Sequence, residues 1–187
     1  MKKFLILILI IIAGGVMLAE NPVVNLSTNM GDITIELYSD KAPITVKNFL
    51  AYVKDGFYND TVFHRVIAGF MIQGGGFTLD GTQKKTLEPI KNEADKGLKN
   101  LEGTIAMART QIVDSATSQF FINCKDNSFL DHGSRDFGYC VFGKVIKGMD
   151  VIKKIETNPT GSKKGMKDWP LEEVIIQSVQ IIEAEKE

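Results

Sequence analysis

The chain has 187 residues, of which 22 are Lys or Arg and 23 are Asp or Glu, so its formal net charge is −1. No basic run is long enough to follow a phosphate backbone, which argues against a nucleic-acid partner. Hydrophobic residues make up 44% of the sequence, which is enough apolar side chain for one domain with a substantial core.

The N-terminus has the layout of a secretory signal. Lys2 and Lys3 precede an apolar run that ends near Ala19, and polar sequence follows. This layout is typical of a signal peptide, and the run is shorter than the ~20 residues that span a bilayer comfortably. We expect a signal peptide over residues 1–19, or a membrane anchor if it is not cleaved, and one domain over residues 20–187. The protein would then be periplasmic or secreted, or membrane-anchored if the signal is retained.

The first part of the domain predicts a hairpin followed by a helix. Residues 23–28 and 32–38 alternate apolar and polar side chains on either side of a short turn that ends in glycine. The period then changes to helical spacing. Pro43 stands at a first helical position and Gly56 follows as a stop, so the pattern predicts a helix over residues 43–54.

The rest of the chain reads mainly as short strands. Residues 63–77 predict two strands around a turn, and residues 149–155 have helical spacing. The segment 159–170, which carries glycine and lysine, is predicted as a loop. Further strands are predicted over residues 104–109, 119–124, 139–146 and 174–182. Many short strands with only two helices favour a mainly β fold, closed and with helices at its ends.

Residues 63–77 read FHRVIAGFMIQGGGF and place two polar side chains among large apolar ones. Burying Arg65 and Gln73 without partners would cost a few kcal/mol each, so we expect them to be paired internally or to face a ligand. The three glycines allow a positive φ and close approach, and we assign them to backbone geometry rather than to ligand chemistry.

Common catalytic chemistries find little support in the sequence. The two histidines, His64 and His132, have no zinc-like spacing, and Ser118 and Cys124 lack a glycine elbow. No phosphate-binding lysine motif follows the glycines. We therefore expect no metal and no cofactor. Cys124 and Cys140 could form a disulfide or remain two buried thiols.

The remaining side chains suit an apolar pocket with a few hydrogen-bonding groups. They are Arg65, Gln73 and Gln119 among Phe63, Phe70, Met71, Phe121 and Phe129. Rotation about an X-Pro peptide bond can be catalysed with these groups alone, because no bond is broken. A guanidinium that donates to the prolyl nitrogen would stabilise the twisted state, in which amide resonance is lost, rather than the ground state.

The sequence resembles the cyclophilin-type peptidyl-prolyl cis-trans isomerases, and among them the bacterial periplasmic branch. The matching stretches are FHRVIAGFMIQGGGF at 63–77, GTIAMART at 103–110, SQFFIN at 118–123, FLDH at 129–132 and GYCVFGKVIKGMDV at 138–151. This resemblance implies a closed eight-stranded antiparallel β-barrel capped by two α-helices, with its active site on the outer face.

The resemblance also implies roles for individual residues. Arg65 would be the catalytic arginine and Gln73 its hydrogen-bonding neighbour. The substrate-binding residues would be His64, Phe70, Met71, Ala108, Arg109, Thr110, Gln119, Phe121, Phe129, Leu130 and Tyr139. Phe129 and Tyr139 stand where many eukaryotic members have tryptophan and histidine, so we expect weak cyclosporin binding. Arg109 replaces a common asparagine, so a backbone contact could remain while a side-chain contact changes.

The function expected from the resemblance is isomerisation of X-Pro bonds that assists folding of exported proteins. The partners would be proline-containing peptides and unfolded or folding proteins, and we expect a monomer. The alternative is a holdase chaperone that uses the same groove without depending on turnover. Apart from the resemblance, Arg65 could equally be a structural arginine paired with a carboxylate, and His64 could be a structural histidine.

Overall fold

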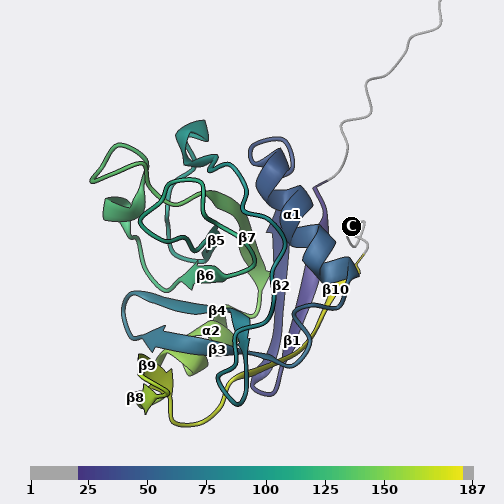
Figure 1. Ribbon diagram of the computed structural model, residues 1–187, viewed down its shortest axis with the longest axis vertical. Coiled ribbons are helices and arrows are strands. Elements are labelled where there is room, and N and C mark those ends of the chain that lie inside the picture. Colours follow the sequence, from purple (N-terminus) through teal and green to yellow (C-terminus); the bar gives the residue numbers. More distant parts are fainter. Residues whose placement is uncertain (1–20, 183–187) are drawn as a thin grey trace, which may run out of the picture.

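Eight strands close into an antiparallel barrel in the order β1-β10-β3-β4-β6-β5-β7-β2 (Figure 1). The computed structural model describes residues 21–182. The barrel strands are β1 (Val23–Thr28), β2 (Gly31–Leu37), β3 (Thr61–Ile67), β4 (Met71–Thr78), β5 (Thr104–Met107), β6 (Phe120–Asn123), β7 (Val141–Lys147) and β10 (Ile175–Ile182). The predicted closed eight-stranded barrel is therefore confirmed. The predicted signal peptide lies outside the described residues.

Two α-helices cover the barrel, as expected. Helix α1 (Pro43–Lys54) begins at the proline, whose fixed φ suits a first helical position, and it packs against β10. Helix α2 (Met149–Glu156) buries Val151, Ile152 and Ile155 and packs against β2 and β4. Two short 3₁₀ turns lie in the loops, η1 (Ala94–Lys96) and η2 (Ser128–Leu130). Within residues 21–182, no helix is long and apolar enough to cross a membrane.

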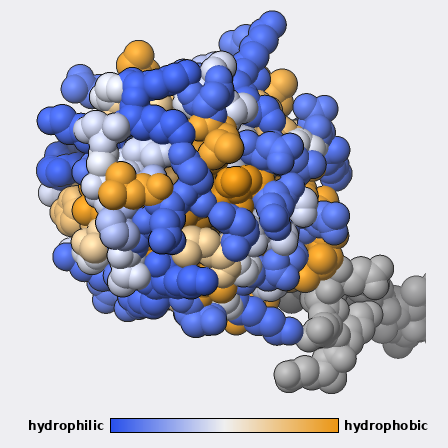
Figure 2. Space-filling view, turned by 90° about the horizontal axis from the view of Figure 1, so that it is seen from below, coloured by the Kyte–Doolittle hydropathy of each residue, from blue (hydrophilic) through white to orange (hydrophobic). Residues whose placement is uncertain are grey.

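Aromatic rings fill the barrel interior. Phe120 is fully buried and lies at the centre of a group of rings, with centroids 5.7 Å from Phe49, 5.6 Å from Tyr58 and 6.0 Å from Phe63. All three pairs are edge-to-face, the arrangement that aromatic quadrupoles favour. Figure 2 shows one face of the exterior, where hydrophobic residues form only small patches between hydrophilic ones. The largest fully buried side chains, apart from Met71, belong to one interior cluster.

The predicted loop over residues 159–170 is wrong. This segment forms a hairpin of β8 (Thr160–Lys163) and β9 (Met166–Pro170), which lies beside β3 (Figure 1). Its two-residue turn is Lys164-Gly165, and both residues have positive φ, as a type I′ turn requires. The strands carry little apolar alternation, so the local pattern gave no strand signal. The hairpin depends on tertiary packing of Trp169, which is 2% exposed.

Candidate active site

A row of paired residues crosses the outer face of four neighbouring strands. Arg65 of β3 lies opposite Gln73 of β4, and Gln73 lies opposite Phe121 of β6. Phe121 in turn lies opposite Ala106 of β5. Residues directly opposite one another in an antiparallel sheet point to the same face. The guanidinium, the amide and the ring are therefore presented together on the outside of the barrel.

A β-bulge in β3 turns Arg65 to this outer face. Phe63 pairs with Gly74 and Arg65 pairs with Gln73, so His64 is an extra residue with no counterpart on β4. Without the bulge, Arg65 would point to the same side as Phe63, which is fully buried in the barrel. Bulges commonly re-aim a side chain next to an active site.

The glycines of β4 make room for the groups behind the site. Gly75 has φ +79°, and a Cβ there would lie 2.7 Å from the Phe120 ring. A Cβ at Gly76 would lie 2.5 Å from Cγ of Gln119. Because Gly76 has no side chain, Gln119 can approach and accept a hydrogen bond of 2.9 Å from Nε2 of Gln73. The glycines thus act through backbone geometry, as the sequence suggested.

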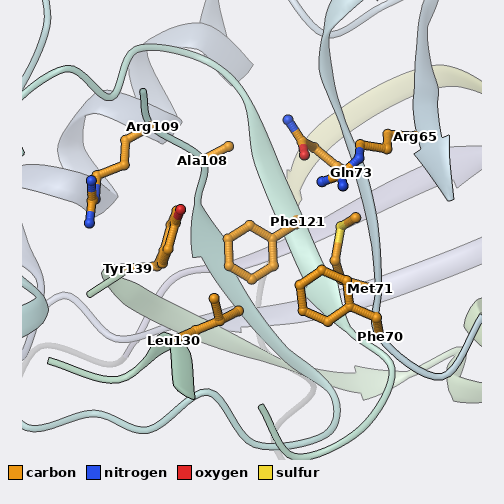
Figure 3. A pocket seen from close by; sticks show the side chains of 9 residues that line it. All are labelled: Arg65, Phe70, Met71, Gln73, Ala108, Arg109, Phe121, Leu130 and Tyr139. Atoms are coloured by element: carbon orange, nitrogen blue, oxygen red, sulfur yellow. The ribbon is translucent and has the colours of Figure 1, made fainter. Parts of the chain in front are cut away.

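The row borders a cavity of about 140 Å³ on the outer face. Its lining residues are Arg65, Phe70, Met71, Gln73, Ala108, Arg109, Phe121, Leu130 and Tyr139 (Figure 3). In Figure 3 the Phe121 ring stands in the middle, with Arg65 and Gln73 on one side and Arg109 and Tyr139 on the other. The cavity is smaller than the ~300–1,000 Å³ of drug-sized pockets, so it suits a single side chain or ring.

Four predicted binding residues do not line the cavity: His64, Thr110, Gln119 and Phe129. Gln119 stands behind Gln73. Phe129 forms a rim, since its ring stacks on Phe70 at 5.5 Å and remains 40% exposed. Thr110 borders a second, more open hollow beyond Arg109 and Tyr139.

His64 points away from the cavity and packs against the hairpin side of the barrel. Its ring lies 4.6 Å from Phe77 and 6.2 Å from Trp169, and the residue is 5% exposed. Burial lowers the pKa of His64 to about 4, and the positive charge of Arg65 acts in the same direction. This histidine is therefore neutral at pH 7 and occupies a structural position.

The side chain of Arg109 joins two loops. Its Nε donates to the Gly138 carbonyl at 3.0 Å and its Nη1 to the Thr110 carbonyl at 3.0 Å. Nη2 pairs with Asp136 at 2.9 Å, and the guanidinium lies over the Tyr139 ring. The side chain is 4% exposed, and each of its three nitrogen atoms has a partner within the protein. Arg109, which stands where an asparagine is common in the family, thus clamps residue 110 to residues 136–138.

Arg65 and Gln73 each have a partner other than the one predicted. Gln73 donates to Gln119, and within residues 21–182 the only side chain that pairs with Arg65 is Asp168, whose Oδ2 lies 3.4 Å from Nε. Sequence reasoning missed Asp168 because it lies in the segment predicted as a loop. Gly165, which suits the second position of a two-residue hairpin turn, is a local signal that could have indicated the hairpin.

The two cysteines are not suited to nucleophilic catalysis. Cys124 and Cys140 are separate buried thiols, so they do not form the disulfide left open by the sequence. Burial raises the pKa of both thiols, that of Cys140 to about 11, which makes them poor nucleophiles at neutral pH. In the part of the chain that the structure describes, no three His, Cys, Asp or Glu side chains gather to hold a metal ion.

Comparison with known proteins identifies the family. The family model for "Cyclophilin type peptidyl-prolyl cis-trans isomerase/CLD" matches residues 23–181, which is most of the chain. The chain is a cyclophilin. Its enzymatic activity is therefore peptidyl-prolyl cis-trans isomerisation, a reaction that the cavity and its guanidinium can support without a nucleophile or a metal.

Relatives of this cyclophilin carry the same activity in their names. It is 59% identical over 157 residues to peptidyl-prolyl cis-trans isomerase A of Dickeya dadantii, covering 84% of this chain and 83% of the relative. It is 58% identical over 163 residues to peptidyl-prolyl cis-trans isomerase B of Escherichia coli, covering 86% and 99%. A crystal structure of a Cryptosporidium parvum cyclophilin, determined in the presence of the dipeptide Ala-Pro, matches with a TM-score of 0.71 and 31% identity. It covers 87% of this chain and 99% of that one.

Proposed function

We propose that this cyclophilin binds a proline side chain in the outer-face cavity and that Arg65 assists rotation about the peptide bond that precedes the proline. The observation that carries this assignment is the position of the Arg65 guanidinium at the edge of a cavity whose apolar wall is formed by Phe70, Met71, Phe121 and Leu130. Those four side chains would hold the ring by apolar contact. The Cryptosporidium parvum cyclophilin determined with Ala-Pro supports a proline-containing peptide as the ligand class.

The barrier to rotation is of order 20 kcal/mol and arises from amide resonance. Lowering it by about 8 kcal/mol would give a roughly million-fold acceleration. As the bond twists, the prolyl nitrogen becomes pyramidal and gains a lone pair that can accept a hydrogen bond. Arg65 would donate to that lone pair, and this interaction stabilises the twisted state selectively.

Gln73 would act next to Arg65 as an oriented polar group. Its amide is fixed by the hydrogen bond to Gln119, so it would present the rest of its hydrogen-bonding capacity to the substrate at little entropic cost. We assign the stretch of residues 108–110 to the peptide backbone before the proline. Tyr139, whose ring packs edge-on against Phe121 at 5.7 Å, would close that side of the pocket.

The roles of these residues are tested by Arg65→Ala in a protease-coupled proline-peptide assay. Removal of a donor aimed at the transition state costs about 10²- to 10³-fold in comparable sites, so kcat/KM should fall by at least about 100-fold. Lys47→Ala removes a cationic side chain from an exposed position of helix α1, outside the cavity, and should stay within about twofold. Full activity in the Arg65 variant, with folding intact, would refute this role.

In the cell, this enzyme would accelerate the folding of exported proteins as a monomer outside the cytoplasm. The basic and apolar N-terminal residues support export. N-terminal sequencing combined with membrane fractionation tests this: a soluble protein that begins near residue 20 supports a cleaved signal, whereas a membrane-bound full chain supports an anchor. A client-aggregation assay with the Arg65 variant separates catalysis from holdase activity, because unchanged protection would show that binding alone suffices.

A further inference from the structure

The carboxylate of Asp168 reaches the active site from outside the barrel. Asp168 lies in β9, and its Oδ2 accepts a hydrogen bond from Nε of Arg65 at 3.4 Å. Isomerisation by Arg65, as described above, gives Asp168 no role. Yet in the described part of the chain it is the only side chain that pairs with this guanidinium.

A β-bulge in β3 and a second one in β9 bring the side chains of Arg65 and Asp168 together. In the hairpin, Gly161 pairs with Trp169 and Ser162 pairs with Lys167, so Asp168 is the extra residue of a bulge. Its φ is +61°, a left-handed conformation that aspartate tolerates better than most residues. The bulge in β3 turns Arg65 outward in the same way. The ion pair is thus formed by two local departures from regular strand geometry.

The hairpin is anchored immediately beside Asp168. The next residue, Trp169, is buried, and its Nε1 donates to Glu173 at 3.0 Å. Lys163 lies over the Trp169 ring, 4.9 Å from its centroid, and forms an ion pair with Glu173. The ring centroid also lies 6.2 Å from that of His64, the bulged neighbour of Arg65. These contacts fix the backbone from which the Asp168 carboxylate projects.

We infer that Asp168 is a positioning residue that holds the plane of the Arg65 guanidinium before the substrate binds. Nε is the guanidinium nitrogen closest to the aliphatic stem. A carboxylate on Nε restrains rotation of the group while both terminal amino groups stay available to the substrate. A free arginine side chain would have to lose this rotational freedom on reaching the transition state. The inference rests on the proposed catalytic role of Arg65.

The expected effect is modest because the pair is partly exposed. The side chains of Arg65 and Asp168 are 42% and 38% exposed, so water and salt screen their attraction. Pairs of this kind contribute little on average, so we expect loss of the carboxylate to lower kcat by about fivefold rather than by orders of magnitude. KM should change little, since the restrained group acts in the transition state.

The test compares three variants with the wild-type chain on an N-acetylated, C-terminally amidated Ala-Pro peptide. Asp168→Gly removes the carboxylate and keeps a residue that accepts φ +61°. Asp60→Gly is the matched control, because Asp60 also has φ +61°, is exposed and does not pair with Arg65. Asp168→Asn keeps an acceptor oxygen and removes the charge, so its kcat should fall by only about twofold.

Salt dependence gives a readout that a purely structural role would not change. Raising the ionic strength from about 10 mM to about 1 M shortens the Debye length from about 30 Å to about 3 Å. The wild-type kcat should fall toward that of Asp168→Gly, whereas the kcat of Asp168→Gly should stay constant. Thermal unfolding of Asp168→Gly and Asp60→Gly, measured in parallel, should show shifts of similar size.

Two results would overturn the inference. One is a kcat of Asp168→Gly equal to or higher than that of Asp60→Gly. The other is a rise in KM with unchanged kcat, which would make Asp168 a substrate contact instead. The Arg65→Ala variant, measured alongside, separates failure of the positioning role of Asp168 from failure of the catalytic role of Arg65. If it is inactive while Asp168→Gly is fully active, only the positioning role fails. If it is fully active, the proposed function of Arg65 fails as well.

Discussion

Phe120 and Phe121 are neighbours in β6, yet they belong to two different apolar clusters on opposite sides of the barrel wall. Phe120 faces the interior, where rings contact it from helix α1, from strand β3 and from the loop between them. Phe121 faces outward and packs with Met71, Leu130 and Tyr139 beside the open cavity. The interior cluster is enclosed by protein, whereas the outer cluster is also buried but borders the cavity.

This difference shows how one sheet can serve both stability and binding. Burial of the inner rings contributes to the folding free energy and leaves no room for a ligand. The outer cluster leaves part of its apolar surface available, so burial of that surface can favour binding of a proline ring. The polar groups Arg65 and Gln73 stand only on the outer side, where they face the cavity rather than the packed interior.

Removal of the inner ring should have the largest effect. Phe120→Ala leaves a large cavity in a packed core and should lower the free energy of unfolding by about 3–5 kcal/mol, measured by denaturant titration. The remaining folded molecules should keep nearly normal kcat/KM because the outer cluster is untouched. Phe120→Leu, a milder change, should lie between. A folded and stable Phe120→Ala protein without activity would show that the two clusters are not separable.

The buried His64, which belongs to neither cluster and packs on the hairpin side of the barrel, should make the folding stability depend on pH. Its pKa is about 4 in the folded protein and about 6.5 when unfolded, so the unfolded chain binds more protons between these values. Stability is therefore fully present above pH 6.5 and falls as the pH is lowered toward 4, by about 3 kcal/mol at most. Denaturant titrations at several pH values measure this loss. The slope should be absent in His64→Gln, and an unchanged slope there would assign it to other groups.

Removal of the outer ring should mainly reduce catalysis. Phe121→Ala deletes the middle of the pocket and should lower kcat/KM by about 30-fold, or roughly 2 kcal/mol of transition-state binding. Its unfolding free energy should fall less than that of Phe120→Ala, because one side of the ring already faces the cavity. Phe121→Leu serves as the control that keeps an apolar wall. Equal losses of stability at both phenylalanines would contradict the distinction.

The smallest expected effect concerns the clamp beside the outer cluster. Arg109→Ala frees the Gly138 and Thr110 carbonyls from their shared donor and uncovers Tyr139. The wall of the pocket should loosen, and KM should rise about threefold with little change in kcat, since ground-state and transition-state binding suffer alike. Arg109→Lys cannot form the same three-pronged contact and should resemble the alanine variant. Steady-state kinetics that show wild-type KM in both variants would dismiss this role.

Much of the barrel could be predicted from the sequence, because many of its helices and strands are indicated by residues within the element itself or next to it. The helix over residues 43–54 has an initiating proline, apolar residues at helical spacing and a terminal glycine, and α1 has the same bounds. The strands around residues 68–69 were indicated by their apolar residues and by the glycine between them. All nine residues that line the cavity were also predicted as site residues, because long stretches of this sequence resemble the family.

The rest depends on tertiary structure. The bulge at His64, which turns Arg65 outward, is a property of register with β4 and leaves no trace in the pattern of β3. The hairpin that carries Asp168 lacks apolar alternation and is stabilised by packing of Trp169. Arg65 pairs with a carboxylate, as one of its two sequence-based alternatives expected, and it also lines the cavity; its catalytic role stays a prediction.

NMR exchange spectroscopy tests most directly whether isomerisation depends on Arg65. The experiment uses an Ala-Pro peptide with catalytic amounts of folded protein. The wild-type chain should produce cis–trans exchange far faster than the uncatalysed process, which takes about 10–100 s. Arg65→Ala, with an unchanged folded spectrum, should reduce the catalysed exchange by at least about 100-fold. Arg65→Lys should also be strongly reduced, because a lysine lacks the fixed fork. Catalysed exchange that persists at the wild-type rate in folded Arg65→Ala would contradict the assignment of catalysis to this guanidinium.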